Sequence, residues 1–181
     1  FARDMTDRNV GSWLMPAAFL QSVNAFFIIV MAPVFGMVWV WLESRQKDPS
    51  IPVKAGLGLL GLSAGFFVLA WGAANASPTS LVSPSWLVVT YFLHTVGELC
   101  ISPIGLSAIT KLSPERRVGQ MMGIWFVGAA LGNLFAGLIG GSLDNLEADT
   151  LFRTVALIVG GAGIVAIIVA PKVRKLMGSV R

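Results

Sequence analysis

The chain has 181 residues, of which 55% are hydrophobic and only 12% are charged, and its formal net charge is +4 at neutral pH. Soluble domains carry about 25% charged residues, so this composition excludes an ordinary soluble domain. One Cys and one His cannot form an internal disulfide or a tetrahedral metal site, and we expect no metal and no cofactor. Because Lys and Arg form no stripe with aromatic readers beside it, we expect no nucleic-acid partner.

The charges are segregated along the chain. Runs without Asp, Glu, Lys or Arg cover 9–42, 55–97, 118–143 and 154–171. Each run reaches the roughly 18–20 residues that are needed to cross the hydrocarbon of a lipid bilayer. The sequence therefore predicts an all-α integral membrane protein.

Five spans are expected, with loops at the polar breaks between them. The predicted helices lie at about 16–42, 53–74, 86–112, 118–143 and 151–170, in a transmembrane bundle over 16–177. Residues 1–15 are expected to hold the end of a preceding helix and an external loop, and 171–181 a cytoplasmic tail. Pro33 predicts a kink in the first span, and Pro171 is expected to stop the fifth.

The basic residues predict the orientation of the spans. The loops at 43–54, 111–117 and 171–181 carry most of them: Arg45, Lys47, Lys54, Lys111, Arg116, Arg117, Lys172, Arg174, Lys175 and Arg181. The loops at 75–85 and 144–150 carry none, so the positive-inside rule predicts a cytoplasmic C-terminus and an external N-terminal segment. Arg153 is an exception, at the outer end of the last span, where its side chain can reach the interface. The short loops favour a bacterial inner-membrane protein.

Glycines in the fourth span repeat at a spacing typical of close helix packing. The pairs are Gly119/Gly123, Gly128/Gly132 and Gly137/Gly141. Small residues four apart let membrane helices approach closely. We therefore expect this span to pack tightly against a neighbour.

Glu98 lies in the middle of the third span, with no other Asp, Glu, Lys or Arg from Ala55 to Thr110. At 1.5 Å per residue it is about 18 Å from Trp86 and from Thr110, near the bilayer midplane. A carboxylate at that depth costs about 2.5 kcal/mol or more unless it is paired, protonated or hydrated. No cation occurs at matching depth in the five spans. Its partner is therefore expected to be another part of the protein, a ligand or a proton.

Few other polar side chains lie at depth, and each has a structural alternative. Asn24, with Gln21 one turn away, can bind a ligand or hydrogen-bond a neighbouring helix, and the sequence leaves both open. For Asn133 we favour the contact between helices. His94 lies one turn from Glu98 and is more often a satisfied helix residue than a functional one.

No enzyme motif is present. An intramembrane metalloprotease needs two His on one helical turn, and this chain has one. A Ser hydrolase needs a base in reach, and no Gly-x-Ser-x-Gly elbow occurs. We therefore expect no catalytic residue, and a hydrolase built on Glu98 and His94 is the weakest hypothesis.

Three motifs resemble one family. They are Gly97-Glu-Leu-Cys-Ile-Ser-Pro-Ile-Gly-Leu-Ser107, Met122-Gly-Ile-Trp-Phe126, and Gln21-Ser-Val-Asn24 followed by Ala32-Pro33. Their joint spacing is similar to helices ten, eleven and eight of the proton-dependent oligopeptide transporter (POT) family of the major facilitator superfamily. Ala25 stands where the family usually has Pro, so the first span is expected to be less kinked beside Asn24.

The resemblance implies a fold, an activity and a site. The five helices would form most of the C-terminal six-helix bundle of a major facilitator fold, which acts as a symporter of protons with di- and tripeptides. Glu98 would bind the peptide N-terminus and take part in proton coupling, and Asn24 would bind the peptide backbone. Trp125 and Phe126 would line a side-chain pocket. The N-terminal half of the transporter, which this chain lacks, would be the partner in alternating access.

An alternative from another class stays open. A membrane scaffold or assembly subunit would pair Glu98 with a Lys or Arg on a partner helix. Loss of that partner in the absence of Glu98, with no effect on peptide binding, would distinguish it from a transporter.

Overall fold

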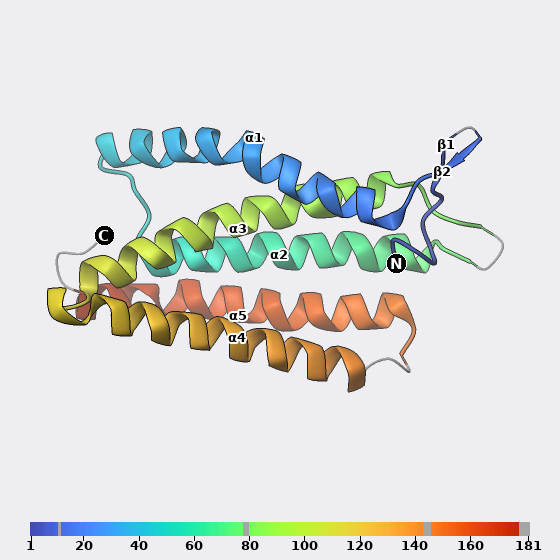
Figure 1. The fold of residues 1–181 in the computed structure, drawn as a ribbon. Coiled ribbons are helices and arrows are strands. Elements are labelled where there is room, and N and C mark those ends of the chain that lie inside the picture. Colours follow the sequence, from blue (N-terminus) through green and yellow to red (C-terminus); the bar gives the residue numbers. More distant parts are fainter. Residues whose placement is uncertain (11, 78–79, 143–145, 178–181) are drawn as a thin grey trace.

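Five long helices make up most of the chain in a computed structural model (Figure 1). The structure describes every residue except 11, 78–79, 143–145 and 178–181, and it leaves the side chains at 10, 102–104, 139, 142 and 177 undescribed. The elements are β1 (Asn9–Val10), β2 (Trp13–Leu14), α1 (Ala17–Ser44), α2 (Ile51–Ala74), α3 (Ser85–Leu112), the 3-10 turn η1 (Glu115–Arg117), α4 (Val118–Ser142) and α5 (Ala148–Met177). All five α-helices are long and apolar enough to cross a bilayer, which confirms the fold class predicted from the charge-free runs.

Proline marks the start of several helices. Pro16 precedes α1, Pro84 precedes α3, and Pro52 lies in the first turn of α2. The fixed φ of proline suits a first turn, where its missing N–H has no acceptor to lose. Pro33 lies near the middle of α1, where it removes one backbone hydrogen bond. Figure 1 shows α1 changing direction about midway, as expected for the predicted kink.

The core of the bundle is α2, which lies between α3 and α5 (Figure 1). On the α3 side, a Cβ added to Gly58 would lie 2.6 Å from the carbonyl oxygen of Gly97. On the α5 side, a Cβ added to Gly56 would lie 2.9 Å from the carbonyl oxygen of Gly163. Neither interface has room for a side chain at these points, so glycine sets the spacing of the three helices.

The glycine pairs of α4 do not mark a close helix contact. A Cβ added to any of them meets no described atom within 4 Å: Gly119, Gly123, Gly128, Gly132, Gly137 and Gly141. The prediction of tight packing at this span is therefore wrong for the described part of the chain. The spacing requires a facing helix, and α4 meets α3 over only a short stretch. A small-residue pattern shows that a face can be approached closely, but it does not say that a partner is there.

The N-terminal segment differs from the expected helix end and loop. Its described residues form turns and a two-stranded hairpin in which β1 pairs antiparallel with β2. The Asp7 side chain accepts a hydrogen bond from the backbone N–H of Asn9 at 3.0 Å, a turn that competes with a helix. Two backbone hydrogen bonds join the segment to the loop before α3, from Asp7 N to Val82 O at 2.8 Å and from Val82 N to Met5 O at 2.9 Å.

The fifth helix does not end at Pro171. It continues through this proline to Met177, so residues 171–177 of the expected tail are helical. A proline inside a helix removes one hydrogen bond but does not require the helix to stop. Arg174 and Lys175 lie in the last turn, where positive side chains interact favourably with the helix dipole. Pro171 therefore marks the end of the apolar run and not the end of the helix.

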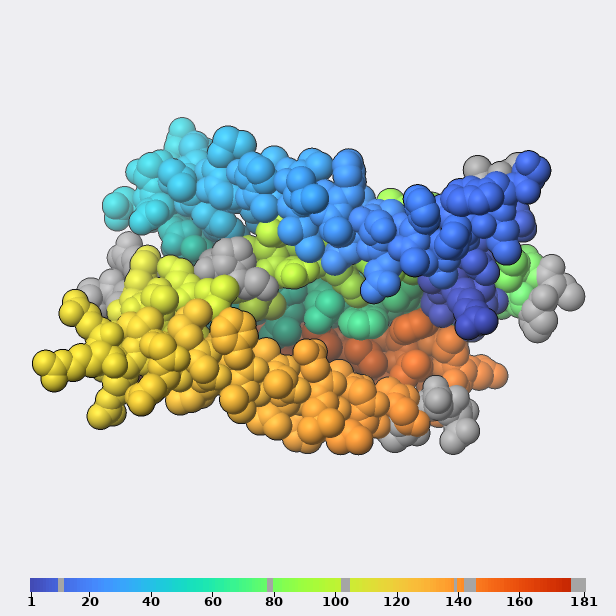
Figure 2. Space-filling model, in the orientation of Figure 1, coloured from blue at the N-terminus to red at the C-terminus, as the bar shows by residue number. Residues whose placement is uncertain are grey.

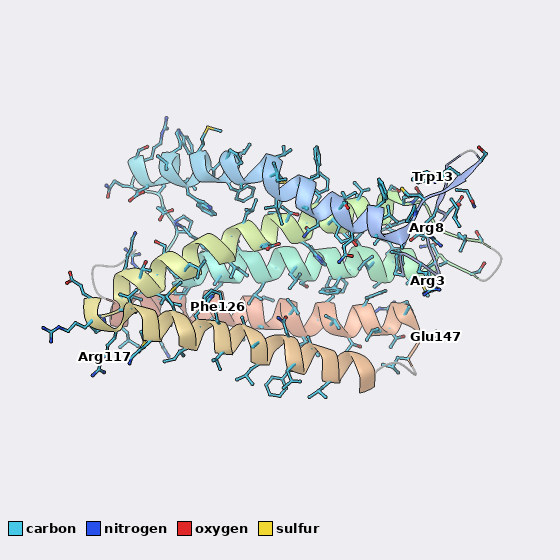
Figure 3. The ribbon with its side chains drawn as sticks, in the orientation of Figure 1. Arg3, Arg8, Trp13, Arg117, Phe126 and Glu147 are labelled. Atoms are coloured by element: carbon cyan, nitrogen blue, oxygen red, sulfur yellow. The ribbon has the colours of Figure 1, made fainter. Side chains whose placement is uncertain are left out.

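Basic residues lie at both ends of the bundle. Figure 3 labels Arg117 at one end and Arg3, Arg8 and Glu147 at the other. The end expected to be external thus carries Arg3 and Arg8 besides Arg153, and it is less depleted of positive charge than the loops alone suggested.

Candidate functional site

A cavity of about 370 Å³ opens where α1, α2 and α3 meet. Figure 2 shows α1 and α4 along opposite edges of one face, with a strip of α2 and α3 between them. The lining residues come from all three helices: Asn24, Gly58, Leu62, Tyr91, His94, Gly97, Glu98 and Ile101. We call this space the Glu98 cavity. It brings together Asn24 and Glu98, two residues that the sequence assigned to one site.

Glu98 reaches the cavity without a counter-ion. Its side chain is exposed, and it makes no ion pair and no hydrogen bond with the described residues. Lys54 is buried at the start of α2, but its Nζ is already paired with Asp48, 2.7 Å from Oδ1 and 2.8 Å from Oδ2. The described residues therefore leave Glu98 without a cation, as the sequence led us to expect.

Asn24 is tied to the helix that carries Glu98. The Oγ1 of Thr95 donates a hydrogen bond of 2.8 Å to Oδ1 of Asn24, and Thr95 is completely buried. One turn separates Thr95 from Glu98, so the two share a face of α3. Asn24 thus makes the contact between helices that the sequence left as one alternative, and it also lines the cavity required by the other.

His94 packs against α2. A Cβ added to Gly65 would lie 2.5 Å from the His94 Nε2, and the ring centroid of Phe66 lies 4.9 Å from that of His94. The imidazole thus fills a space that exists because residue 65 has no side chain. These contacts are structural, but the buried Nε2 has no hydrogen-bond partner among the described residues, so His94 is not the fully satisfied histidine that the sequence analysis preferred.

Trp125 lies outside the Glu98 cavity. Its ring covers Gly105 of α3, where an added Cβ would lie 2.5 Å from the ring. It lines a second, apolar space of about 640 Å³ with residues from the end of α3 and the start of α4, among them Ile109, Leu112, Met121 and Ile124. We call this space the Trp125 groove.

Phe126 follows Trp125 on α4 but faces elsewhere. It is 60% exposed and is not among the residues that line the Glu98 cavity or the Trp125 groove. Figure 3 shows it part-way along α4, which begins at the end of the bundle that carries Arg117. The structure thus brings Asn24 and Glu98 together but joins neither Trp125 nor Phe126 to them.

Among the residues at the site that the sequence did not assign to it, two carry hydroxyl groups. Tyr91 lines the Glu98 cavity two turns before Glu98, and Thr95 holds Asn24. Spacings of three and seven residues from Glu98 place both on its face of the helix. That periodicity places Thr95 on the same face as Glu98 in the sequence, and it could have identified Tyr91 as well. The pairing of Thr95 with Asn24, 71 positions away in the chain, could not be read from it.

Known proteins are similar to this chain in sequence and in fold. The family described as "PTR2: POT family" matches residues 1–156. The peptide transporter YePEPT of Yersinia enterocolitica is 44% identical over 186 residues, covering 99% of this chain and 36% of its own length. Dipeptide and tripeptide permease A of Escherichia coli K12 is 32% identical over 168 residues, covering 86% of this chain and 33% of its own length.

Solved structures of peptide transporters are similar to this chain in fold. A crystal structure of the peptide transporter POT in complex with sulfate superposes with a TM-score of 0.87 at 36% identity, over 97% of this chain and 35% of that chain. A mutant of peptide transporter POT in complex with alafosfalin gives a TM-score of 0.81 at 38% identity, over 98% of this chain and 36% of that chain. The chain thus spans about a third of the length of the proteins that it matches. With most of its residues matched by the family and its five helices arranged as in these structures, the chain belongs to the POT family.

Proposed function

We propose that this chain is the C-terminal part of a symporter that imports di- and tripeptides together with protons. The family and the names of the relatives, a peptide transporter and a dipeptide and tripeptide permease, support a peptide as the substrate. Transport would proceed by alternating access, in which one half of the molecule rocks against the other around a central site.

The observation that carries this proposal is Glu98, without an ion pair to any described residue, beside Asn24 in one cavity. A carboxylate at the depth of a membrane interior needs a positive partner or a proton. The N-terminal ammonium of a peptide is such a partner, and a charge-assisted hydrogen bond to it is about twice as strong as a neutral one. An amide can hydrogen-bond the peptide backbone, which loses its water on entry. Glu98 and Asn24 would thus bind the N-terminal end of the peptide.

The position of Trp125 suits the far end of such a peptide. Its ring lies over Gly105, seven residues after Glu98, which is about 10 Å along α3. An extended tripeptide spans about 10 Å. Trp125 would contact peptide side chains, and an apolar aromatic wall accepts side chains of varied shape.

The rest of the transporter would complete the site. Basic residues of the N-terminal half would bind the peptide carboxylate, since the described part of this chain offers no free cation at the Glu98 cavity. Glu98 would carry a proton when no peptide ammonium is bound. When the ammonium displaces this proton, the proton would pass to a group in the rest of the transporter and travel inward with the peptide, since its release to the outside would make the two cargoes exchange. The basic loops would lie in the cytoplasm, with the C-terminus, in a multi-pass protein of the cell inner membrane.

Glu98→Gln in the full-length transporter tests this proposal. The amide keeps the shape of the side chain but cannot be charged or carry the proton, so proton-driven dipeptide uptake into proteoliposomes should be abolished. Glu115→Gln is the matched control, because Glu115 is an exposed carboxylate in η1. Retained uptake by Glu98→Gln, with the wild type active, would contradict the proposal.

A blocked N-terminus separates the ammonium role from the proton role. Wild type should bind an N-acetylated dipeptide much more weakly than the free dipeptide, because the acetyl group removes the positive charge. Glu98→Gln should lose most of that preference. A scaffold that pairs Glu98 with a partner helix predicts the opposite pattern, in which a co-purifying protein is lost and peptide binding is unchanged.

A further inference from the structure

Thr95 uses its hydroxyl in an unusual way for a buried threonine in a helix. Such hydroxyls commonly donate to the carbonyl four residues earlier, as Thr90 does here to Trp86 O at 2.8 Å. Thr95, five residues later and 0% exposed, donates instead across the helix interface to Oδ1 of Asn24 at 2.8 Å. This hydrogen bond joins α1 to α3 at the wall of the Glu98 cavity.

The bond decides which end of the Asn24 amide is available. An amide oxygen accepts and an amide nitrogen donates. The oxygen of Asn24 is held by Thr95, whereas its Nδ2 makes no hydrogen bond with any residue that the structure describes. Nδ2 is not fully buried, and Asn24 lines the Glu98 cavity, so this donor is accessible to a ligand there. Asn24 therefore presents a donor to whatever enters.

We propose that Thr95 is a positioning residue that fixes Asn24 as a hydrogen-bond donor, so that the Glu98 cavity selects ligands with a carbonyl oxygen close to their ammonium group. This inference rests on the proposed peptide transport, and it adds the polarity of the Asn24 contact. Thr95 and Glu98 are one turn apart on α3, so the donor and the carboxylate are held at a set separation. An α-amino acyl group, with its ammonium next to a carbonyl, matches that pair.

Three variants of the full-length transporter test the role of Thr95. Thr95→Val keeps the shape of the side chain and removes the hydroxyl, so Asn24 becomes free to rotate. The loss of one neutral hydrogen bond to the substrate should raise the KM for dialanine uptake by about three- to tenfold and leave kcat nearly unchanged. Thr95→Ser retains the hydroxyl and should restore a KM close to the wild-type value. Thr90→Val is the matched control, because it removes another buried hydroxyl from the same helix without touching Asn24.

A change in the ligand shows that the lost interaction is the carbonyl contact. A dialanine with a thioamide in place of the peptide bond accepts a hydrogen bond weakly. The penalty of Thr95→Val should therefore shrink for the thioamide, measured as inhibition of dipeptide uptake. In a double-mutant cycle, Asn24→Ala together with Thr95→Val should raise KM no more than Asn24→Ala alone, since both remove the same donor.

The outcomes separate this inference from the function on which it rests. If the wild type takes up no dipeptide, the proposed function fails and the positioning role fails with it. If the wild type is active but Thr95→Val and Thr90→Val have the same KM, only the positioning role is overturned. Additive effects of Asn24→Ala and Thr95→Val, or an undiminished penalty with the thioamide, would also overturn it.

Discussion

The crossing of α2 and α3 depends on glycine, and Gly58→Ala tests this. The Cβ of alanine would lie 2.6 Å from the carbonyl oxygen of Gly97, and closer still to a side-chain atom of Ile101. The first distance is about 0.8 Å short of the 3.4 Å at which ordinary van der Waals contact begins. Ile101 can change rotamer, but the carbonyl oxygen belongs to the backbone of α3. The two helices must therefore move apart to admit the methyl group.

The free-energy cost of the steric clash can be separated from the gain that alanine brings through its higher helix propensity. Forcing an extra carbon into a packed site costs about 1–3 kcal/mol. Alanine inside a helix gains back about 0.5–1 kcal/mol relative to glycine. Gly132→Ala on α4 receives the same gain without the clash, because no described atom lies within 4 Å of its added Cβ. The two variants should therefore differ by the clash itself, about 1–3 kcal/mol.

Unfolding of the purified transporter in mixed micelles, followed by circular dichroism as SDS is added, measures this difference. Gly58→Ala should unfold at a lower SDS fraction than the wild type, and Gly132→Ala at the same fraction or a higher one. Gly161→Ala on α5 is a second open control. Equal stability of the Gly58 and Gly132 variants would refute the view that glycine contacts set the distance between α2 and α3.

Two further substitutions test contacts away from this crossing. Asp48→Asn leaves Lys54 buried without its counter-ion, and among the described residues the ring of Trp39, 4.6 Å from Nζ, remains beside the charge. The change should lower the free energy of unfolding by about 3 kcal/mol. The same SDS titration on Glu43→Gln, at an exposed carboxylate with no described ion pair, is the control, and coinciding transitions would contradict a buried ion pair. Trp125→Ala should change the order of preference among tripeptides that differ in one side chain, measured by competition, and an unchanged order would argue against a role of this ring in binding.

Much of the fold was predictable because the bilayer restricts what a sequence can do. A helix satisfies every backbone group inside hydrocarbon within a single segment, so a continuous charge-free run of about 20 residues predicts a spanning helix. The same reasoning singled out Glu98, because a charge at that depth needs a special reason. Its lack of a counter-ion could also be predicted, since a cation missing from the spans cannot be supplied by their packing.

The errors occurred where the structure depends on which helices face each other. The glycines of α4 have the spacing of a packing motif but meet no described atom, whereas Gly61 and Gly65 of α2, with the same spacing, lie close against α3. The effect of Pro171 depends on whether the chain beyond it gains from staying helical, which hydropathy does not report. The hydrogen bond from Thr95 to Asn24 likewise requires α1 and α3 to be aligned along their axes so that these two residues face each other. That alignment cannot be predicted from either residue alone.

The distribution of the site over the helices bears on how a ligand could move them. Glu98 and Thr95 belong to α3, which packs closely on the α2 core, whereas Asn24 and Trp125 lie on α1 and α4, which have fewer contacts with that core. A ligand that contacts all three helices adds contacts where the bundle itself has few. It would therefore favour the arrangement in which α1 and α4 lie close to α3, and only a difference in affinity between arrangements can shift their populations. Under the proposed function, binding residues on the loosely packed helices, opposite a carboxylate fixed to the core, would give the transporter that difference.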